Sequence, residues 1–284
     1  MANLKEIRNR IGSVSSTMQI TSAMKMVSAA KLKKAQDAIT AMRPYADKLT
    51  ELLQNLSATL DADSGSKYSE QREIKNVLLV AITSNRGLCG AFNSNIIKQA
   101  NLVAKRYDAN VSVVAIGKKA NDALSKNFEV ISNQSAVYDE LTFDNVAEIA
   151  EMLMEKFESK AVDKIEIIYN KFKNAATQEI MTEQFLPIEP LEGDTNTNLD
   201  YIFEPSKEEI VETLIPKSLK TQLFKAIRDS FASEHGARMT AMHKATDNAT
   251  ELRDQLKLTY NKARQAAITN EILEIVGGAE ALNG

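Results

Sequence analysis

The chain has 284 residues, of which 44% are hydrophobic and 26% are charged, and its formal net charge is −3 at pH 7. This composition is ordinary for a globular protein with one large or two ordinary domains. A slightly acidic chain without tryptophan lacks both the basic surface and the stacking side chains of a dedicated nucleic-acid binder. A single cysteine, Cys89, excludes an internal disulfide and favours a reducing compartment.

No apolar run in the sequence approaches the roughly 20 residues that a membrane-spanning helix needs. A coiled-coil pattern begins directly after Met1 and leaves no room for a signal or transit peptide. We therefore expect a mature protein that begins near Met1 and works in a cytoplasm.

The first segment, residues 1–60, is predicted to form one long helix. From Leu4 to Leu60, alternate steps of three and four residues land on apolar side chains at most positions, which is the a/d seam of a coiled coil. At about 1.5 Å per residue such a helix is roughly 85 Å long. Pro44 removes one backbone hydrogen bond and should bend the helix, but it falls away from the seam, so the coil can continue past it.

The seam is polar at three consecutive positions, and bulky apolar residues lie beside it there. The polar positions are Thr21, Lys25 and Ser28, and the apolar neighbours are Met24, Met26 and Val27. Two explanations remain open: a stutter in the coil, or an apolar patch presented to another subunit, for which methionine is well suited. Residues 1–48 also carry nine lysine and arginine side chains against three carboxylates, which indicates either a solvated face or an acidic partner.

The middle of the chain alternates strand and helix signals, which predicts an α/β unit over residues 70–205. Runs of β-branched residues or partial alternation predict strands at 75–83, 111–116, 128–131, 163–169 and 179–187. The last two have the pattern of sheet-edge or antiparallel strands. Helical spacing occupies 91–106, 118–127 and 145–159, and the proline-containing segment 187–205 is predicted to be a loop or linker.

The sequence offers several candidate chemical sites, none of which is complete. The glycine-containing turn 84–90 follows a strand and precedes a helix, but it has neither the dinucleotide-binding nor the P-loop spacing. Cys89 lies near Arg86, yet the α/β unit contains no histidine to serve as its base, which favours a buried structural thiol. His235 and His243 are two helical turns apart, too far to share one metal. We expect no catalytic site, no metal site and no cofactor.

The last segment, residues 206–284, is predicted to be a second long helix that pairs antiparallel with residues 1–60, because neither helix can bury its apolar stripe alone. Near its end, apolar side chains surround the helix on nearly all sides, at Ile268, Ile272, Leu273, Ile275 and Val276. The helix should extend past its partner by roughly ten residues, or about 15 Å. An external sleeve around this overhang is therefore implied. The fold class is mixed α+β and α/β: an antiparallel coiled coil of long N- and C-terminal helices with a central Rossmann-like α/β domain.

Six sequence blocks along the chain carry a family resemblance. In order they are MKMVSAAKLKKAQ (24–36), RGLCGAFN (86–93), SEHGARMTAM (233–242), ATDNA (245–249), YNKARQAAIT (260–269) and the C-terminal run ITNEILEIVGGA (268–279). They resemble the gamma subunits of F-type ATP synthase, and the C-terminal run is similar to that family's signature. Two departures are Asn85, where the family often has aspartate, and Gly236, where alanine is common. They put in doubt any charge-dependent role at position 85.

The resemblance implies a rotor that carries out no catalysis itself. In this family the two terminal helices form a shaft inside a ring of three alpha and three beta subunits, and the α/β foot contacts the c-ring of the membrane sector and the epsilon subunit. Proton flow turns the shaft, whose asymmetry drives the beta sites through their states. The chain has neither the chloroplast insert with its cysteine pair nor a mitochondrial transit peptide. The resemblance thus implies a peripheral membrane protein on the cytoplasmic side of a bacterial inner membrane.

The resemblance also implies roles for particular residues. Contact with an acidic segment of the beta subunit would involve Met24, Lys25, Lys31, Lys33 and Lys34, and contact with a catch loop of beta would involve Arg264, Gln265 and Thr269. The apolar tip formed by Ile268, Ile272, Ile275 and Val276 would turn in a hydrophobic bearing at the top of the ring.

Two alternatives from other classes remain open on the residues alone. One is an α/β enzyme or small-molecule-binding domain that uses its helical arms to oligomerise, which would need a ligand site in the sheet. The other is a cytoskeletal or chromosomal scaffold, which would associate with itself through the arms.

Overall fold

The computed structural model describes residues 4–57, 67–188 and 207–283. It divides into two compact units. The shaft unit contains residues 1–28 and 239–284, and the foot unit contains residues 29–238. The predicted domain limits at 60, 70 and 205–206 fall on or next to segments outside the described residues, so the division into 1–60, 70–205 and 206–284 stays a prediction.

The described elements include each of the predicted strands and helices. In chain order they are α1 (Leu4–Ser57), β1 (Asn76–Ile82), α2 (Phe92–Ala104), β2 (Asn110–Ile116), α3 (Lys118–Leu124), β3 (Glu129–Asn133), the short 3-10 helix η2 (Ser135–Tyr138), α4 (Phe143–Glu158), β4 (Lys164–Phe172), β5 (Gln178–Leu186) and α5 (Lys207–Asn283).

The foot unit is built on one five-stranded sheet with the order β3-β2-β1-β4-β5. Strands β3, β2, β1 and β4 run parallel to one another, and β5 pairs antiparallel with β4 at the edge. The chain first builds outward from β1 through β2 to β3 and then returns to the other side of β1 with β4. The point where the strand order reverses therefore lies between β1 and β4, as it does in doubly wound folds.

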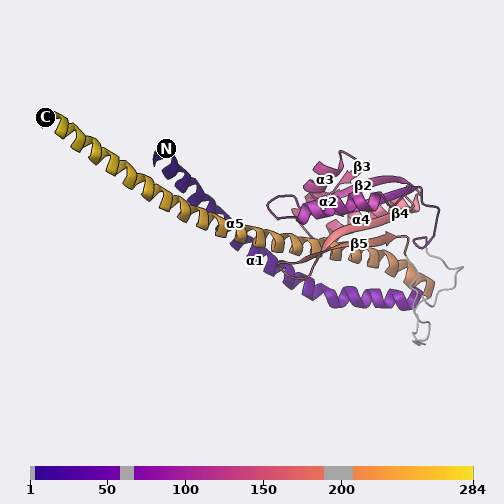
Figure 1. The fold of residues 1–284 in the computed structure, drawn as a ribbon. Helices are drawn as coiled ribbons and strands as arrows, with labels where there is room; N and C mark the ends of the chain where they lie inside the picture. Colours follow the sequence, from indigo (N-terminus) through magenta and orange to yellow (C-terminus); the bar gives the residue numbers. More distant parts are fainter. Residues whose placement is uncertain (1–3, 58–66, 189–206, 284) are drawn as a thin grey trace. The chain divides into compact units, whose positions relative to one another are not determined.

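Both faces of the sheet are buried, because side chains along β1 alternate between two apolar clusters. Leu78, Val80 and Ile82 pack with α4 and the foot-unit part of α5. Val77 and Leu79 point the other way and pack with α2 and α3. Figure 1 shows these helices beside the strands. Residues 214–227 of α5 thus belong to the core of the foot unit.

The predicted seam of α1 is confirmed. Every predicted a/d position from Leu4 to Leu49 is buried or half-buried, including the polar ones. Pro44 lies inside the helix with an exposed side chain, and the seam continues past it with Ala46 and Leu49 buried.

In the shaft unit, α1 and α5 run antiparallel, as predicted, and cross-helix polar contacts set their register. The hydroxyls of Thr21 and Thr246 lie 2.8 Å apart, and Lys25 Nζ donates to His243 Nδ1 at 3.3 Å. In these pairs the residue numbers add up to 267 and 268, which places Leu4 opposite residue 263 or 264.

The overhang of α5 is longer than predicted. Side chains from Arg264 to Ala279 are all exposed, a length of about 24 Å at 1.5 Å per residue. The prediction of about 15 Å was wrong because it compared helix lengths, whereas the polar pairs fix the register and so determine where α1 stops covering α5.

Candidate functional site

Two regions carry the candidate functional residues: the exposed surfaces of the terminal helices, and the carboxyl edge of the sheet. On the first, Met26 and Val27 are exposed at 64% and 57%, while Thr21 and Ser28 are buried. The polar seam residues therefore remain in the seam, which favours an exposed apolar patch over a stutter. Met24 and Lys25 lie between these extremes, half-buried.

Of the four lysines predicted to meet an acidic partner, Lys31, Lys33 and Lys34 are exposed on α1 within the foot unit. Lys31 differs from the other two because its charge acts on Glu234 and His235 of α5. It offsets part of the burial effect that raises the pKa of Glu234, and it adds to the burial and the Arg238 charge that lower the pKa of His235. The charge of Lys31 therefore acts partly on buried groups of the protein itself.

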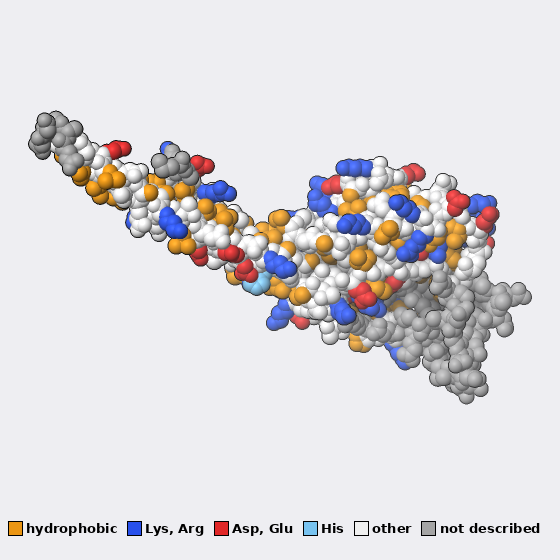
Figure 2. Space-filling model, viewed as in Figure 1, with side chains coloured by type: hydrophobic (Ala, Val, Ile, Leu, Met, Phe, Trp, Pro, Cys, Tyr) orange, Lys and Arg blue, Asp and Glu red, His pale blue; other side chains and the backbone are white. Residues whose placement is uncertain are grey.

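The predicted contact residues of the C-terminal helix lie together on the overhang. Arg264, Gln265 and Thr269 are exposed, and the Thr269 hydroxyl donates to the Gln265 carbonyl oxygen at 2.9 Å. The tip residues Ile268, Ile272, Ile275 and Val276 are exposed at 48% to 67%. Figure 2 shows apolar side chains gathered along this end of α5. An exposed apolar surface of this kind marks an interaction site.

The second region is the turn 84–90, which the chain forms between β1 and α2 where the strand order reverses. Asn93 of α2 closes this turn from within: Ser84 N donates to Asn93 Oδ1 at 3.0 Å, and Asn93 Nδ2 lies 3.2 Å from Cys89 Sγ. Leu88 and Gly90 have φ values of 62° and 61°, in the left-handed region. The turn therefore holds a fixed shape and directs backbone carbonyls towards α5.

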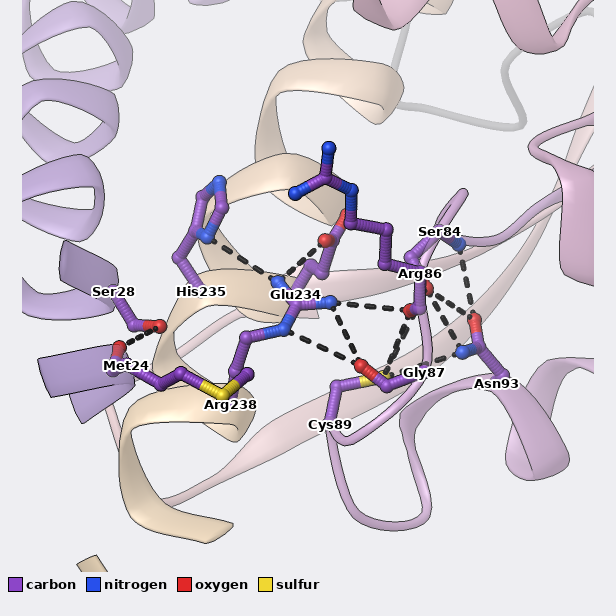
Figure 3. A network of polar contacts seen from close by, with 10 residues as sticks. All are labelled: Met24, Ser28, Ser84, Arg86, Gly87, Cys89, Asn93, Glu234, His235 and Arg238. Carbon is purple, nitrogen blue, oxygen red and sulfur yellow. Dashed lines mark hydrogen bonds and ion pairs between the residues drawn. The ribbon is translucent and has the colours of Figure 1, made fainter. Parts of the chain in front are cut away.

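The guanidinium of Arg238, from α5, faces this turn (Figure 3). Its Nη2 donates to the carbonyl oxygens of Arg86 and Gly87 at 3.1 and 3.3 Å, and its Nη1 contacts Glu234 Oε1 at 2.6 Å. One turn earlier, Ser233 Oγ donates to the Asn170 carbonyl oxygen near the end of β4 at 2.9 Å. Helix α5 thus contacts both the turn after β1 and strand β4, at the sheet edge where doubly wound folds bind their ligands.

The cluster is deeply buried, and burial controls its protonation. Glu234 and Arg238 are each 8% exposed, and His235 is 5% exposed. Burial raises the pKa of Glu234 in spite of the nearby Arg238 charge. Burial, together with the charges of Arg238 and Lys31, lowers the pKa of His235 to about 4, so its ring is neutral at pH 7.

This arrangement does not activate Cys89. Burial raises the pKa of the Cys89 thiol, with only partial opposition from its Ser84 hydrogen bond and the Arg238 charge. His235 of α5 lies in the same cluster, although the sequence analysis placed no histidine near Cys89. Its Nδ1 faces Arg238 at 3.5 Å. A nucleophilic cysteine needs a lowered pKa and an adjacent base, and the cluster supplies neither.

Two absences among the described residues bear on other functions. Within ranges 4–57, 67–188 and 207–283, no group of three or more His, Cys, Asp or Glu is placed to hold a metal ion. Over the same residues, none of the helices combines the length and the hydropathy needed to cross a bilayer.

Comparisons with known proteins agree with this geometry. A family model described as ATP synthase matches residues 3–282. The ATP synthase gamma chains of Flavobacterium psychrophilum and Christiangramia forsetii are 77% and 70% identical, and each alignment covers all of both chains. The chain therefore belongs to the gamma-chain family of ATP synthase.

Two solved structures have a similar fold. A chain from the central stalk and c-ring of Tetrahymena thermophila mitochondrial ATP synthase is 27% identical, with a TM-score of 0.59, and the match covers 80% of this chain and 99% of that one. A chain from the rotor of Euglena gracilis mitochondrial ATP synthase has a TM-score of 0.65 at 23% identity, over 93% of this chain and 98% of that one, and supports the fold.

Proposed function

We infer that the protein is the central-stalk rotor subunit of F-type ATP synthase and couples rotation to ATP synthesis or hydrolysis at the beta subunits without catalysing either reaction. The observation that carries this inference is the identity of 77% over the full length of a gamma chain. The structure supports it with an exposed apolar helix end and with an arginine of α5 bound to the sheet edge where related folds bind ligands. The exposed apolar end suits a subunit that turns inside a sleeve.

The partners follow from the family and from the surfaces. Three alpha and three beta subunits surround one rotor, and the foot unit meets epsilon and the c-ring of the membrane sector. The exposed tip at Ile268, Ile272, Ile275 and Val276 supports an apolar bearing formed by the ring, because water is a poor environment for this much apolar surface. No nucleic acid takes part in this function.

We further propose that two sets of polar residues transmit the coupling to beta. Met24, Lys25, Lys31, Lys33 and Lys34 meet an acidic segment, and the exposure of Lys33 and Lys34 supports this for the outer positions. Arg264, Gln265 and Thr269 meet a catch loop from the overhang. Thr269 uses its hydroxyl proton within the helix, so towards beta it acts as a hydrogen-bond acceptor.

The protein belongs to the sector of the complex that lies outside the bilayer, and it reaches the membrane only through the c-ring. We propose the cytoplasmic face of a bacterial inner membrane, because the relatives at 77% and 70% identity come from bacteria. The division into an N-terminal coiled-coil helix (1–60), an α/β foot (70–205) and a C-terminal coiled-coil helix (206–284) is the corresponding proposal for its domains.

The test is assembly. Coexpression with alpha and beta subunits of the same organism should yield a complex with one copy of this chain to three of each partner, measured by native mass spectrometry. The complex should hydrolyse ATP, and its rate should drop when this chain is omitted. A chain that purifies alone and binds nucleotides in equilibrium dialysis would instead support the α/β ligand-binding alternative. Self-association through the arms would support the scaffold alternative.

A further inference from the structure

The Arg238 cluster joins the foot-unit part of α5 to the sheet of the same unit. Arg238 is the last residue of the foot unit along α5, before the helix continues into the shaft unit. From this position it hydrogen-bonds the turn after β1, and Ser233 hydrogen-bonds the end of β4. One and a half turns of helix are thereby tied to two neighbouring strands of the central sheet.

These bonds resist a different motion from the apolar packing around them. Apolar contacts are non-directional, so side chains such as Leu223 and Ile227 hold α5 against the sheet but oppose rotation about the helix axis only through their shape. A charged guanidinium that donates to two fixed carbonyls is directional and stronger than a neutral hydrogen bond. The contacts of Arg238 therefore oppose a twist of α5 within the foot.

The surroundings keep the guanidinium in place. Glu234, one turn earlier on α5, holds Nη1 at 2.6 Å, and the carbonyl acceptors belong to a turn that Asn93 closes from within. Both charges are almost fully removed from water, where breaking one partner of a pair is strongly unfavourable. We call Arg238, Glu234 and the two carbonyl acceptors the clamp. Breaking its contacts is therefore unfavourable.

We propose that Arg238 is a positioning residue for torque transfer: it locks α5 rotationally to the carboxyl edge of the sheet at the point where the helix leaves the foot. This proposal rests on the rotor function proposed above. In other doubly wound folds this edge of the sheet binds a ligand. Here it binds the Arg238 side chain, whose role in the proposal is mechanical.

The test compares variants in the assembled complex with alpha and beta subunits. Arg238→Gln removes the charge and the fork, and Arg238→Lys keeps the charge but cannot donate in the same planar arrangement. The matched control is Arg228→Gln on the same helix, since Arg228 is also partly buried but donates to the Leu141 carbonyl outside the sheet. All proteins carry Cys89→Ala and a single reporter cysteine at the exposed position Leu102 of α2.

Two measurements distinguish loss of the clamp from a general loss of protein stability. The first is ATP hydrolysis by the unloaded complex, and the second is the angular variance of a probe on the foot while the alpha and beta subunits are fixed to a surface. We expect Arg238→Gln to leave unloaded hydrolysis within about twofold and to raise the angular variance by about twofold or more, because charge-assisted hydrogen bonds are lost. Arg238→Lys should lie between Arg238→Gln and the parent, and Arg228→Gln should match the parent.

Each other outcome has a defined meaning. Equal angular variance in Arg238→Gln and the parent overturns the clamp, and so does an equal increase in Arg228→Gln. If Arg238→Gln does not fold, Ser233→Ala replaces it, and the variance should then rise by a smaller amount; no rise overturns the proposal. If the parent protein itself neither assembles with alpha and beta nor rotates with ATP, the rotor function fails, a result distinct from failure of the clamp.

Discussion

The foot unit and the shaft unit place charged and apolar side chains in opposite ways. In the described part of the foot unit, Glu234 and Arg238 are buried as a pair, and the apolar residues fill two clusters on the sheet. In the described part of the shaft unit, the buried polar residues are the neutral Thr21 and Ser28, and the large apolar residues of the overhang are exposed. The foot unit thus completes its own interior, whereas the shaft unit leaves apolar surface for partners to cover.

The largest effect that would test this comparison comes from the same substitution made in both units. Gly117 in the foot has a φ of 107°, and a Cβ there would lie 2.2 Å from the Thr83 carbonyl oxygen. Gly117→Ala should therefore cost on the order of 3 kcal/mol or more, or prevent folding. Gly277→Ala in the overhang meets nothing within 4 Å and should stabilise the helix by at most about 1 kcal/mol.

Urea unfolding monitored by circular dichroism measures both changes. Gly12→Ala, in α1 of the shaft unit with open space around it, is the matched control for a helical glycine. A Gly117→Ala protein as stable as the parent would show that the foot can relax at its strand ends, contrary to a tightly filled interior.

The second prediction concerns the pH dependence that burial gives to the foot unit. The pKa of His235 is lowered to about 4, so the unfolded chain binds a proton at higher pH than the folded chain. The stability due to neutral His235 is complete above about pH 6.5 and declines as the pH falls towards 4, by about 3 kcal/mol in total. The substitution His235→Gln should flatten the pH dependence of the unfolding free energy in this window.

Glu234 contributes with the opposite sign, because its raised pKa favours the folded state at low pH and this contribution is lost as the pH rises. The comparison is therefore between the pH profiles of His235→Gln and the parent, both of which contain Glu234. His243→Gln provides a control in the shaft unit, where the histidine is exposed. Parallel profiles for His235→Gln and the parent would mean that His235 is solvated in solution.

The sequence predicts the periodic parts of both units well and the contacts between distant segments poorly. The seam from Leu4 to Leu49 and the buried strand Asn76–Ile82 follow from local patterns, because helices and strands each bury a face at a fixed period. The register of the helix pair depends on Thr21 meeting Thr246, and no local pattern encodes which residues pair across such a separation. The length of the overhang was mispredicted for this reason.

The Arg238 cluster was missed for a related reason. Arg238 and its carbonyl acceptors at Arg86 and Gly87 are about 150 residues apart, and backbone carbonyls carry no side-chain signal. A sequence signal did exist: two charged residues, Glu234 and Arg238, stand four apart on a helix whose neighbouring positions are small or apolar. Such an i,i+4 pair on a face that is otherwise buried indicates an internal ion pair.

The third prediction concerns the stability effects of the α1 lysines. Lys33→Glu with Lys34→Glu should change the unfolding free energy by no more than about 1 kcal/mol, because exposed charges contribute little. Adding Lys31→Glu should destabilise the foot unit further, since it places a negative charge near buried Glu234. Thermal unfolding of the double and triple variants measures the difference, and equal melting temperatures would contradict the internal role of Lys31.

The same variants test the acidic partner. Reversal at Lys33 and Lys34 should weaken ATP-driven proton pumping by the reassembled complex, because the positive face would repel an acidic segment of beta. Lys98→Glu with Lys105→Glu, on and just after α2, reverses the same amount of charge elsewhere in the foot unit and is the control. Proton pumping at the parent level in the Lys33 and Lys34 variant would show that this face is only solvated.

The smallest effect on stability is expected in the overhang, where a triple alanine substitution of Arg264, Gln265 and Thr269 should leave folding and assembly unchanged. All three side chains are exposed, and alanine has the highest helix propensity. A hydrogen bond from this face to the ring that forms at one rotational position and breaks at the next would contribute about 0.5–1.5 kcal/mol, and more where arginine is charged. Steady-state turnover should fall, while nucleotide binding at a single catalytic site should change little.

The control for this variant is a triple alanine substitution at Lys257, Tyr260 and Lys262, which are polar positions of α5 outside the proposed contact. Stopped-flow measurement of single-site and multisite hydrolysis on both complexes separates coupling from chemistry. Because Thr269 already donates its proton to Gln265, restoring Thr269 alone should recover less turnover than restoring Arg264 alone. Full multisite turnover in the triple variant would exclude a switching contact here, and these three residues would then be only solvated positions of the shaft.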